Sequence, residues 1–161
     1  MRNWFLWMVL TLCVLSAFPA AASQAANVVI VVNKQNPVND LSHEKLVKIF
    51  KAEKQFWDDG QKIYLILRET GSPEKKTLLQ TVYQMDEVTL RKYWLTKIFR
   101  QEIPSFPKTL SSSEAVKRFV NQVPNAVGAI DARSMDDTVK ALTIDGKSFH
   151  DEGYPLIDPS R

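Results

Sequence analysis

The chain has 161 residues, with 21 basic and 18 acidic side chains, and its formal net charge at neutral pH is +3. The basic residues are interspersed with acidic ones and form no block, which excludes a polybasic membrane segment and a nucleic-acid-binding groove. Its one cysteine, Cys13, lies in the apolar start of the chain. A fold without disulfides is therefore expected, stabilised by a hydrophobic core.

The first 22 residues are predicted to be a cleavable signal peptide. Arg2 gives a short basic start, residues 4–18 are almost wholly apolar, and small residues follow, with cleavage favoured after Ala22. The apolar run of about 15 residues is shorter than the roughly 20 that span a bilayer. The alternative is an uncleaved N-terminal anchor. We expect a periplasmic protein whose residues 23–161 form one domain.

The first half of that domain begins with a strand, which is followed by a helix and a second strand. Residues 27–33 form a continuous β-branched run, typical of a strand buried on both faces. Ser42 is the expected N-cap of a helix that buries Leu46, Ile49 and Phe50. A second strand is predicted over residues 63–67.

Two helices should follow the second strand. Ser72 is the expected cap of the first helix, with Pro73 at its first position, where a missing N–H costs nothing. Asp86 is the expected cap of the second helix, and apolar spacing predicts the inward residues Leu90, Trp94, Ile98 and Phe99.

The last third of the chain should add one more helix and two strands. Three serines at 111–113 start a helix that Pro124 ends, and residues 126–131 indicate a short buried strand. Residues 139–144 are predicted to form one edge strand that turns at Asp145 and Gly146, and the residues beyond His150 a loosely packed tail. Strands interspersed with helices predict an α/β fold, in which helices flank a mixed, mostly parallel sheet.

The turn after the second strand is the strongest candidate for a binding site. A helix start leaves backbone N–H groups free, and Arg68 adds a permanent cation beside them. We interpret this turn as an oxyanion site. Its candidate ligands are Arg68, Thr70, Gly71, Ser72, Glu74 and Lys75. The alternative is an ordinary capped helix with a surface arginine, because capping uses the same residue types. A carboxylate at a helix start also competes with an external anion.

The order of these segments resembles the second lobe of the substrate-binding protein of phosphate ABC transporters. The resemblance rests on residues 28–33, Asn36-Pro37, residues 41–50, Trp57 before Gly60, Arg68 with Ser72, and residues 124–130. It implies one lobe of a periplasmic binding protein type II-like fold, with phosphate or a similar oxyanion bound weakly at the turn. Pro73 and Glu74 depart from the glycine and threonine of that family, and both changes weaken a phosphate cradle. Full-length members bind their ligand between two lobes, whereas this chain has the length of one.

Catalytic and metal-binding patterns are weak. His43 and His150 are the only histidines and lie far apart, and the predicted mature chain has no cysteine. The pairs Asp58-Asp59 and Asp136-Asp137 are typical of turns and helix caps. We therefore expect a protein that is not an enzyme and that uses no metal or cofactor.

Two classes of function remain. The first is an exported solute-binding protein that resembles the phosphate-binding component of an ABC transporter and works with a membrane transporter. The second is a periplasmic interaction module that has lost phosphate transport and binds an envelope or sensor protein. The second class predicts an exposed apolar patch that includes Trp57 or Phe106. Pairing of two copies to rebuild a two-lobed cleft is a variant of the first class.

Overall fold

The first strand lies inside the main sheet and packs on both of its faces. In a computed structural model that describes residues 28–157, β1 (Val28–Val32) is completely buried. Val28, Ile30 and Val32 face one core, and Val29 and Val31 face another. This alternation is the pleat of a strand covered on both sides, as the β-branched run predicts. The predicted signal peptide lies outside the described residues.

The main sheet is mixed and has five strands in the order β4-β3-β5-β1-β6. The parallel pairs are β3 with β4 and β3 with β5, whereas β1 is antiparallel to β5 and β6. Parallel pairs therefore do not outnumber antiparallel ones within this sheet. The remaining strands are β2 (Asp40–Leu41), β3 (Tyr64–Arg68), β4 (Lys108–Leu110), β5 (Ala126–Asp131), β6 (Lys140–Ala141) and β7 (Thr143–Ile144).

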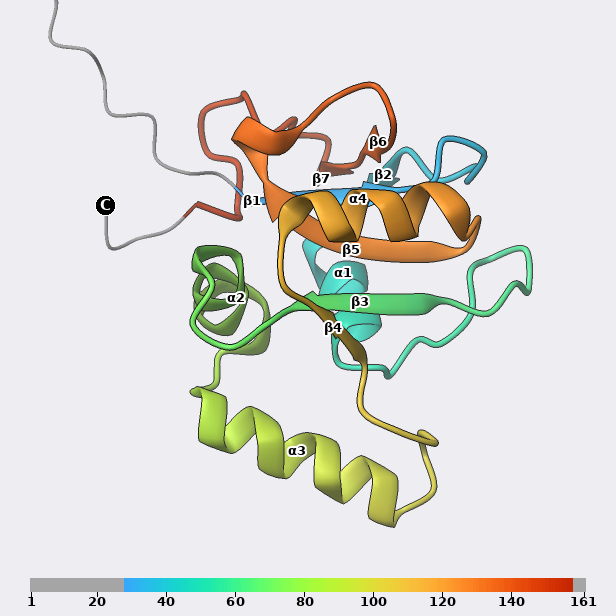
Figure 1. Ribbon diagram of the computed structural model, residues 1–161, viewed down its shortest axis with the longest axis vertical. Helices are drawn as coiled ribbons and strands as arrows, with labels where there is room; N and C mark the ends of the chain where they lie inside the picture. Colours follow the sequence, from blue (N-terminus) through green and yellow to red (C-terminus); the bar gives the residue numbers. More distant parts are fainter. Residues whose placement is uncertain (1–27, 158–161) are drawn as a thin grey trace, which may run out of the picture.

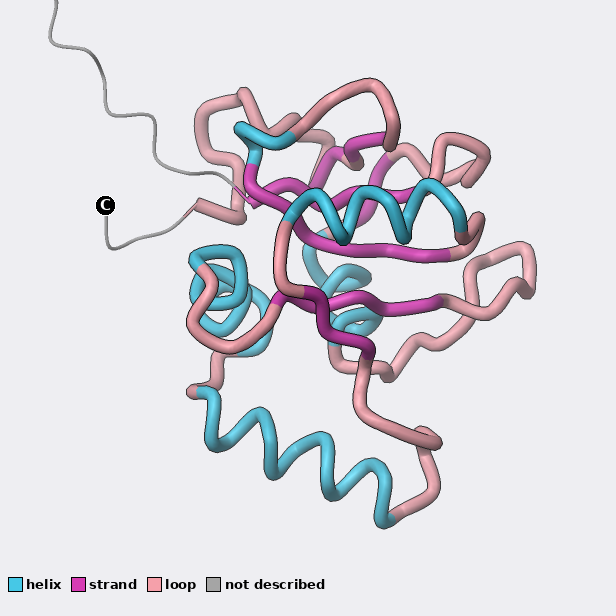
Figure 2. Tube along the Cα trace, viewed as in Figure 1, coloured by secondary structure: helices cyan, strands magenta, loops and turns pink. Residues whose placement is uncertain are grey.

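Helices cover both faces of this sheet (Figures 1 and 2). One face packs on α4, and the other packs on α1, α2 and the five-residue π-helical turn that extends α2. Their bounds are α1 (His43–Phe50), α2 (Pro73–Leu78), the π-turn (Leu79–Tyr83), α3 (Glu87–Phe99) and α4 (Ser113–Gln122). A short 3-10 turn (Ala132–Ser134) follows β5. The α/β expectation is confirmed. Within residues 28–157, no helix is long and apolar enough to cross a membrane.

The predicted helix starts are confirmed by their hydrogen bonds. The side chains of Ser42, Ser72 and Asp86 each accept from the backbone N–H three residues further on. Ser112 does the same for α4. Each cap depends only on residues within four positions, which is why the sequence locates it well.

Three predictions about the packing of segments are wrong. Residues 139–144 do not form one edge strand, because β6 pairs with β1 while β7 pairs with β2 in a second, two-stranded sheet. The segment after His150 is not loose, since Tyr154 and Leu156 are buried and the Leu156 carbonyl accepts from the Val28 N–H. Phe99 points outward from the end of α3 and is 88% exposed, whereas Lys97 is buried.

Candidate functional site

Three parallel strands end at the same edge of the main sheet. Arg68, Leu110 and Asp131 are the last residues of β3, β4 and β5. The starts of α2 and α4 follow β3 and β4 there. In open α/β sheets, ligands bind outside the carboxyl ends of the strands, so this edge is where a site is expected.

At this edge, Arg68 is neutralised by a carboxylate of the same chain. Its Nε atom lies 3.3 Å from Glu74 Oε1, and both side chains are at most 10% exposed. Ser113 Oγ donates to the same Glu74 oxygen at 2.7 Å and accepts from the Asp131 N–H. One Arg68 Nη donates to the Leu110 carbonyl. Glu74 thus occupies the position beside Arg68 at which an external oxyanion was expected.

The other polar groups of the turn are also used within the chain. Ser72 Oγ accepts from the Lys75 N–H at 3.2 Å and donates to the Glu69 carbonyl at 2.9 Å. Gly71 has a φ of +86°, a left-handed backbone that glycine adopts without strain. Thr70 donates its hydroxyl to Glu87. The two hydroxyl donors of the turn therefore already have acceptors, whereas Arg68 Nε makes no hydrogen bond with a described residue and contacts Glu74 as an ion pair only.

A pocket of about 450 Å³ lies next to this turn, between the end of β3, α3 and the segment that leads into β4. Its lining combines cationic and polar side chains with apolar ones: Leu67, Arg68, Thr70, Lys75, Glu87, Leu90, Arg91, Trp94, Phe106, Pro107 and Thr109. Three of the predicted site residues, Arg68, Thr70 and Lys75, therefore line the same pocket. Gly71, Ser72 and Glu74 are not among the residues that line it.

Lys75 is the unusual charge of this pocket. It is 4% exposed, and its Nζ makes no hydrogen bond or ion pair with any described residue. Its Nζ lies over the ring of Tyr83, whose centroid is 5.8 Å away. Burial lowers the pKa of Lys75, an effect that the negative charge of Glu87 partly opposes. An ammonium group on a largely buried side chain that makes no direct ion pair favours an anion beside it.

The pocket also contains residues that the sequence interpretation did not assign to a site. Arg91, on α3, is exposed and makes no ion pair with any described residue. Trp94 was predicted as a core residue; it is buried, yet it also lines the pocket. The sequence held one indication that these residues lie together: Glu87, Arg91 and Trp94 are four and three residues apart, which places them on one side of a predicted helix. The same spacing is common among surface residues that bind no ligand, so it does not identify a site.

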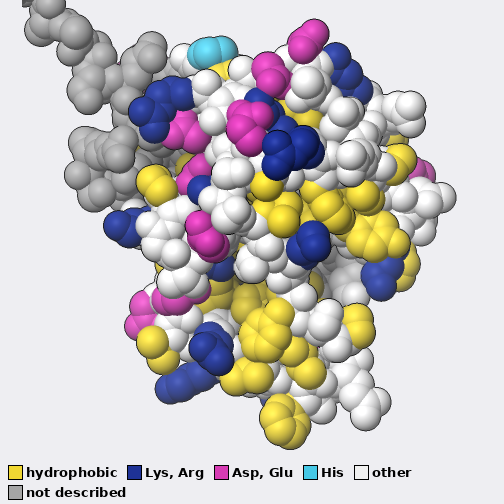
Figure 3. All heavy atoms as spheres, in the orientation of Figure 1, with side chains coloured by type: hydrophobic (Ala, Val, Ile, Leu, Met, Phe, Trp, Pro, Cys, Tyr) yellow, Lys and Arg dark blue, Asp and Glu magenta, His cyan; other side chains and the backbone are white. Residues whose placement is uncertain are grey.

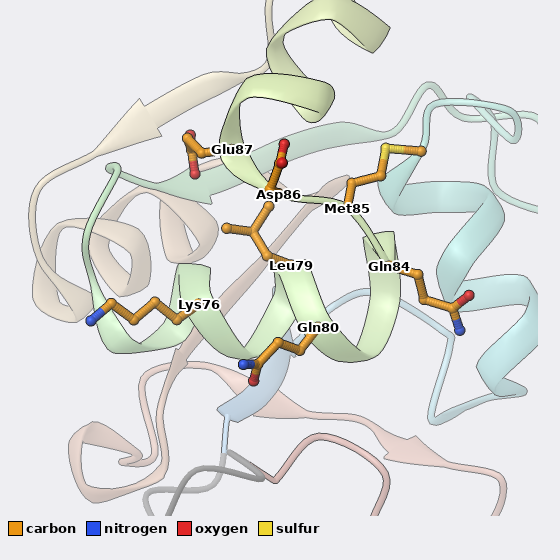
Figure 4. Close-up of a pocket in the computed structure, with 7 residues that line it drawn as sticks. All are labelled: Lys76, Leu79, Gln80, Gln84, Met85, Asp86 and Glu87. Carbon is orange, nitrogen blue, oxygen red and sulfur yellow. The ribbon is translucent and has the colours of Figure 1, made fainter.

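A second pocket, of about 520 Å³, lies on the outer side of the π-turn (Figure 4). Its lining residues are Lys76, Leu79, Gln80, Gln84, Met85, Asp86 and Glu87. The side chains of Lys76, Gln80 and Gln84 point away from one another and do not converge on one point. This arrangement does not define a ligand position.

A mixed sheet between helices thus carries a charged pocket at the carboxyl end of a strand. A family model described as the PBP superfamily domain matches residues 24–152. The chain therefore belongs to this superfamily. No curated protein matches it.

Solved structures of phosphate-binding proteins share the fold. An ABC-type phosphate transport receptor from Vibrio cholerae is 24% identical, with a TM-score of 0.61 over 76% of this chain and 48% of that one. A putative phosphate ABC transporter substrate-binding protein with bound phosphate from Clostridium perfringens is 22% identical, with a TM-score of 0.62 over 76% and 46%. PstS from Borrelia burgdorferi is 15% identical, with a TM-score of 0.63 over 81% and 54%. The chain spans about half the length of these structures.

Proposed function

We propose that this protein is a non-enzymatic, periplasmic binding lobe that holds phosphate or a similar oxyanion weakly in the pocket beside β3. The observation that carries the proposal is Lys75, a buried side chain in the lining of that pocket whose ammonium group makes no direct ion pair with a described residue. An oxyanion would provide a counter-ion in direct contact. The bound phosphate of the Clostridium perfringens structure supports the ligand class through the shared fold.

The charges around the pocket favour an anion but limit its affinity. Lys75, Arg91 and Arg68 give three positive charges against the carboxylate of Glu87, and Glu74 already neutralises Arg68. Arg91 is exposed, so its contribution is screened by salt. We therefore expect millimolar affinity at low ionic strength, and a steep loss of binding as salt is added.

This proposal gives new roles to the predicted residues. Lys75 contributes charge, whereas Arg68 is neutralised by Glu74 and the Thr70 hydroxyl, at the pocket wall, donates to Glu87. Ser72 positions the backbone N–H of Lys75, and Gly71 allows the tight turn that precedes it. Glu74 orients Arg68 and does not contact the anion.

Calorimetry on the mature chain with phosphate and with sulfate tests the proposal. Lys75→Met should reduce the affinity at least tenfold. Lys76→Met is the matched control, because Lys76 is the next residue and is exposed outside this pocket. Removing a buried, unpaired charge should also keep or raise the melting temperature, so that lost binding is not lost folding. Absence of binding by the wild-type chain, or equal binding by Lys75→Met, would overturn the proposal.

Export is tested by fractionation of the producing cells. We expect the chain in the periplasmic fraction, with Ser23 as its first residue after cleavage behind Ala22. A chain that stays in the membrane fraction with its first residues intact would instead support the uncleaved anchor.

The second candidate function, an interaction module for an envelope or sensor protein, is favoured by the outward side of α3. Val88, Leu95 and Phe99 are 64%, 41% and 88% exposed and lie seven and four residues apart, on the side of α3 opposite the buried Leu90 and Trp94. Apolar side chains gather on this part of the surface (Figure 3). Of the two residues named as alternatives for an exposed apolar patch, Phe106 is 45% exposed, whereas Trp57 is buried.

Light scattering and cross-linking distinguish the outcomes for this surface. A partner captured by the wild-type chain and lost in Phe99→Ser would support the module, and a dimer lost in the same variant would support pairing of two copies. A monomer that captures nothing from an envelope extract would exclude both.

A further inference from the structure

We propose that the pocket beside β3 selects an organic anion with an aromatic or apolar body over a bare inorganic oxyanion, an inference that rests on the proposed function. The cationic groups occupy only part of the lining. Five apolar residues make up much of the rest: Leu67, Leu90, Trp94, Phe106 and Pro107. A small, fully polar ion leaves this part of the wall in contact with water.

The size of the pocket agrees with a larger ligand. Its volume of about 450 Å³ falls within the range of roughly 300–1,000 Å³ found for sites of small organic molecules. Such sites combine apolar walls with a few polar groups that fix the orientation of the ligand. Here Lys75 and Arg91 supply the charge, and Thr109 supplies a hydroxyl group.

Buried donors without partners gather on the same side of the molecule. The indole N–H of Trp94 and the hydroxyl of Tyr83 are buried and have no hydrogen-bond partner among the described residues. The Tyr83 ring lies edge-on to Trp94, with centroids 6.3 Å apart, and Lys75 lies over it. Of these two residues, Trp94 lines the pocket and Tyr83 does not, so the Trp94 ring is the one that a ligand in the pocket would contact.

Phe106 is the residue that best separates the two ligand classes. It is 45% exposed and lies at the pocket wall just before Pro107 and β4. Its ring offers a face for stacking with a second ring, a contact that an inorganic ion does not make. Because the side chain is half exposed, its removal should leave the fold intact.

Phosphate, methyl phosphate and phenyl phosphate form the test series, since the esters share one head group and differ in the body attached to it. We expect phenyl phosphate to bind at least tenfold more tightly than methyl phosphate in calorimetry. Phe106→Ala should remove this advantage and leave the affinity for methyl phosphate unchanged. Phe56→Ala is the matched control, because Phe56 is 54% exposed and does not line the pocket.

Indole N–H signals give a direct readout of the binding position. The predicted mature chain has two tryptophans, of which Trp57 already donates to the Asn125 carbonyl and Trp94 has no described acceptor. In a ¹⁵N correlation spectrum, phenyl phosphate should shift the Trp94 indole signal and leave that of Trp57 in place.

The outcomes separate the two proposals. If phosphate and methyl phosphate bind through Lys75 but phenyl phosphate binds no more tightly, the preference for an organic anion is wrong and the oxyanion site stands. If Phe106→Ala weakens the binding of phenyl phosphate while Lys75→Met does not, the preference for an apolar ligand body is supported and the proposal that Lys75 binds the oxyanion is wrong. If none of the three ligands binds, both proposals are overturned.

Discussion

Glu74 Oε1 lies 3.3 Å from Arg68 Nε and accepts a 2.7 Å hydrogen bond from Ser113, so the carboxylate links the end of β3 to the start of α4. The Glu74 carboxylate therefore lies beside Arg68 at the edge of the sheet, where an external anion was expected. The two charges are nearly fully buried, which makes their pairing important for folding. Breaking such a pair by removing one partner typically costs about 3–5 kcal/mol.

Replacing Glu74 should show whether its carboxylate keeps an external anion from binding to Arg68. Glu74→Gln keeps an acceptor for Ser113 but leaves Arg68 without its counter-ion, so we expect the free energy of unfolding to fall by about 3 kcal/mol. Because Arg68 then accepts an external anion, millimolar sulfate should raise the melting temperature of Glu74→Gln more than that of the wild type. Glu69→Gln, in the same turn but exposed, is the control. An equal sulfate response in all three proteins would show that Arg68 remains unavailable.

The charge of Lys75 should make anion binding depend on pH. Burial lowers the pKa of this ammonium group from its ordinary value of 10.5, so it loses its proton at a lower pH than an exposed lysine. Anion affinity should therefore be highest below the lowered pKa and fall as the pH rises through it. Sulfate is the suitable probe, because it does not titrate in this range.

Lys75→Arg separates this titration from other effects of pH. Arginine stays protonated up to a pH of about 12, so sulfate binding by this variant should not decline at alkaline pH. A parallel decline in the wild type and the variant would assign the pH dependence to another group.

The carboxyl group of Asp58 should make the stability of the fold depend on pH in the acid range. Hydrogen bonds from Lys45 and Lys54, at 2.6 and 2.9 Å, lower the pKa of this carboxyl from 3.8 to about 2. The stabilisation is present above the ordinary pKa of 3.8 and is lost as the pH falls through about 2. The melting temperature of Asp58→Asn should thus depend less on pH in this window than that of the wild type. Asp59→Asn serves as the control, and an identical acid dependence in Asp58→Asn would contradict the assignment.

Gly128 should be required for α4 to pack on the sheet. A Cβ atom at this position would lie 2.6 Å from a methyl carbon of Val116, and the site is closed on that side by Val120. Gly128→Ala should therefore reduce the free energy of unfolding by about 1–3 kcal/mol, the usual cost of overpacking. In a Val116→Ala background the same change should cost less, because the clashing methyl group is gone. Additive losses in the double mutant, measured by urea unfolding, would refute this explanation.

Structural features that depend only on residues close together in the sequence could be predicted from it. The β-branched run of β1, the caps Ser42, Ser72 and Asp86, and the turn at Asp145 and Gly146 all appear as predicted. Each is fixed by sterics or hydrogen bonds within a few positions. The α/β class and the resemblance to phosphate-binding lobes followed from the order of these elements.

The packing of the segments against one another was harder to predict, because it depends on contacts between residues that are far apart in the sequence. Lys97 lies on the face of α3 that carries Leu90 and Trp94 and is buried beside Glu102 and Tyr93, whereas Phe99 lies on the opposite face and is exposed, although its apolar ring predicts burial. A helical period predicts which residues share a face, but the position of the covering elements decides which face is buried.

The sequence by itself determined the α/β class, the longer helices and buried strands with their caps, and the presence of Arg68, Glu74 and Lys75 at one strand-to-helix turn. Only the tertiary structure decided that Glu74 neutralises Arg68 while Lys75 is left in the pocket wall without a direct ion pair. The reason is physical: charge pairing and burial depend on groups such as Ser113, Trp94 and Phe106, which lie far along the chain and meet the turn only when the sheet and α3 are in place.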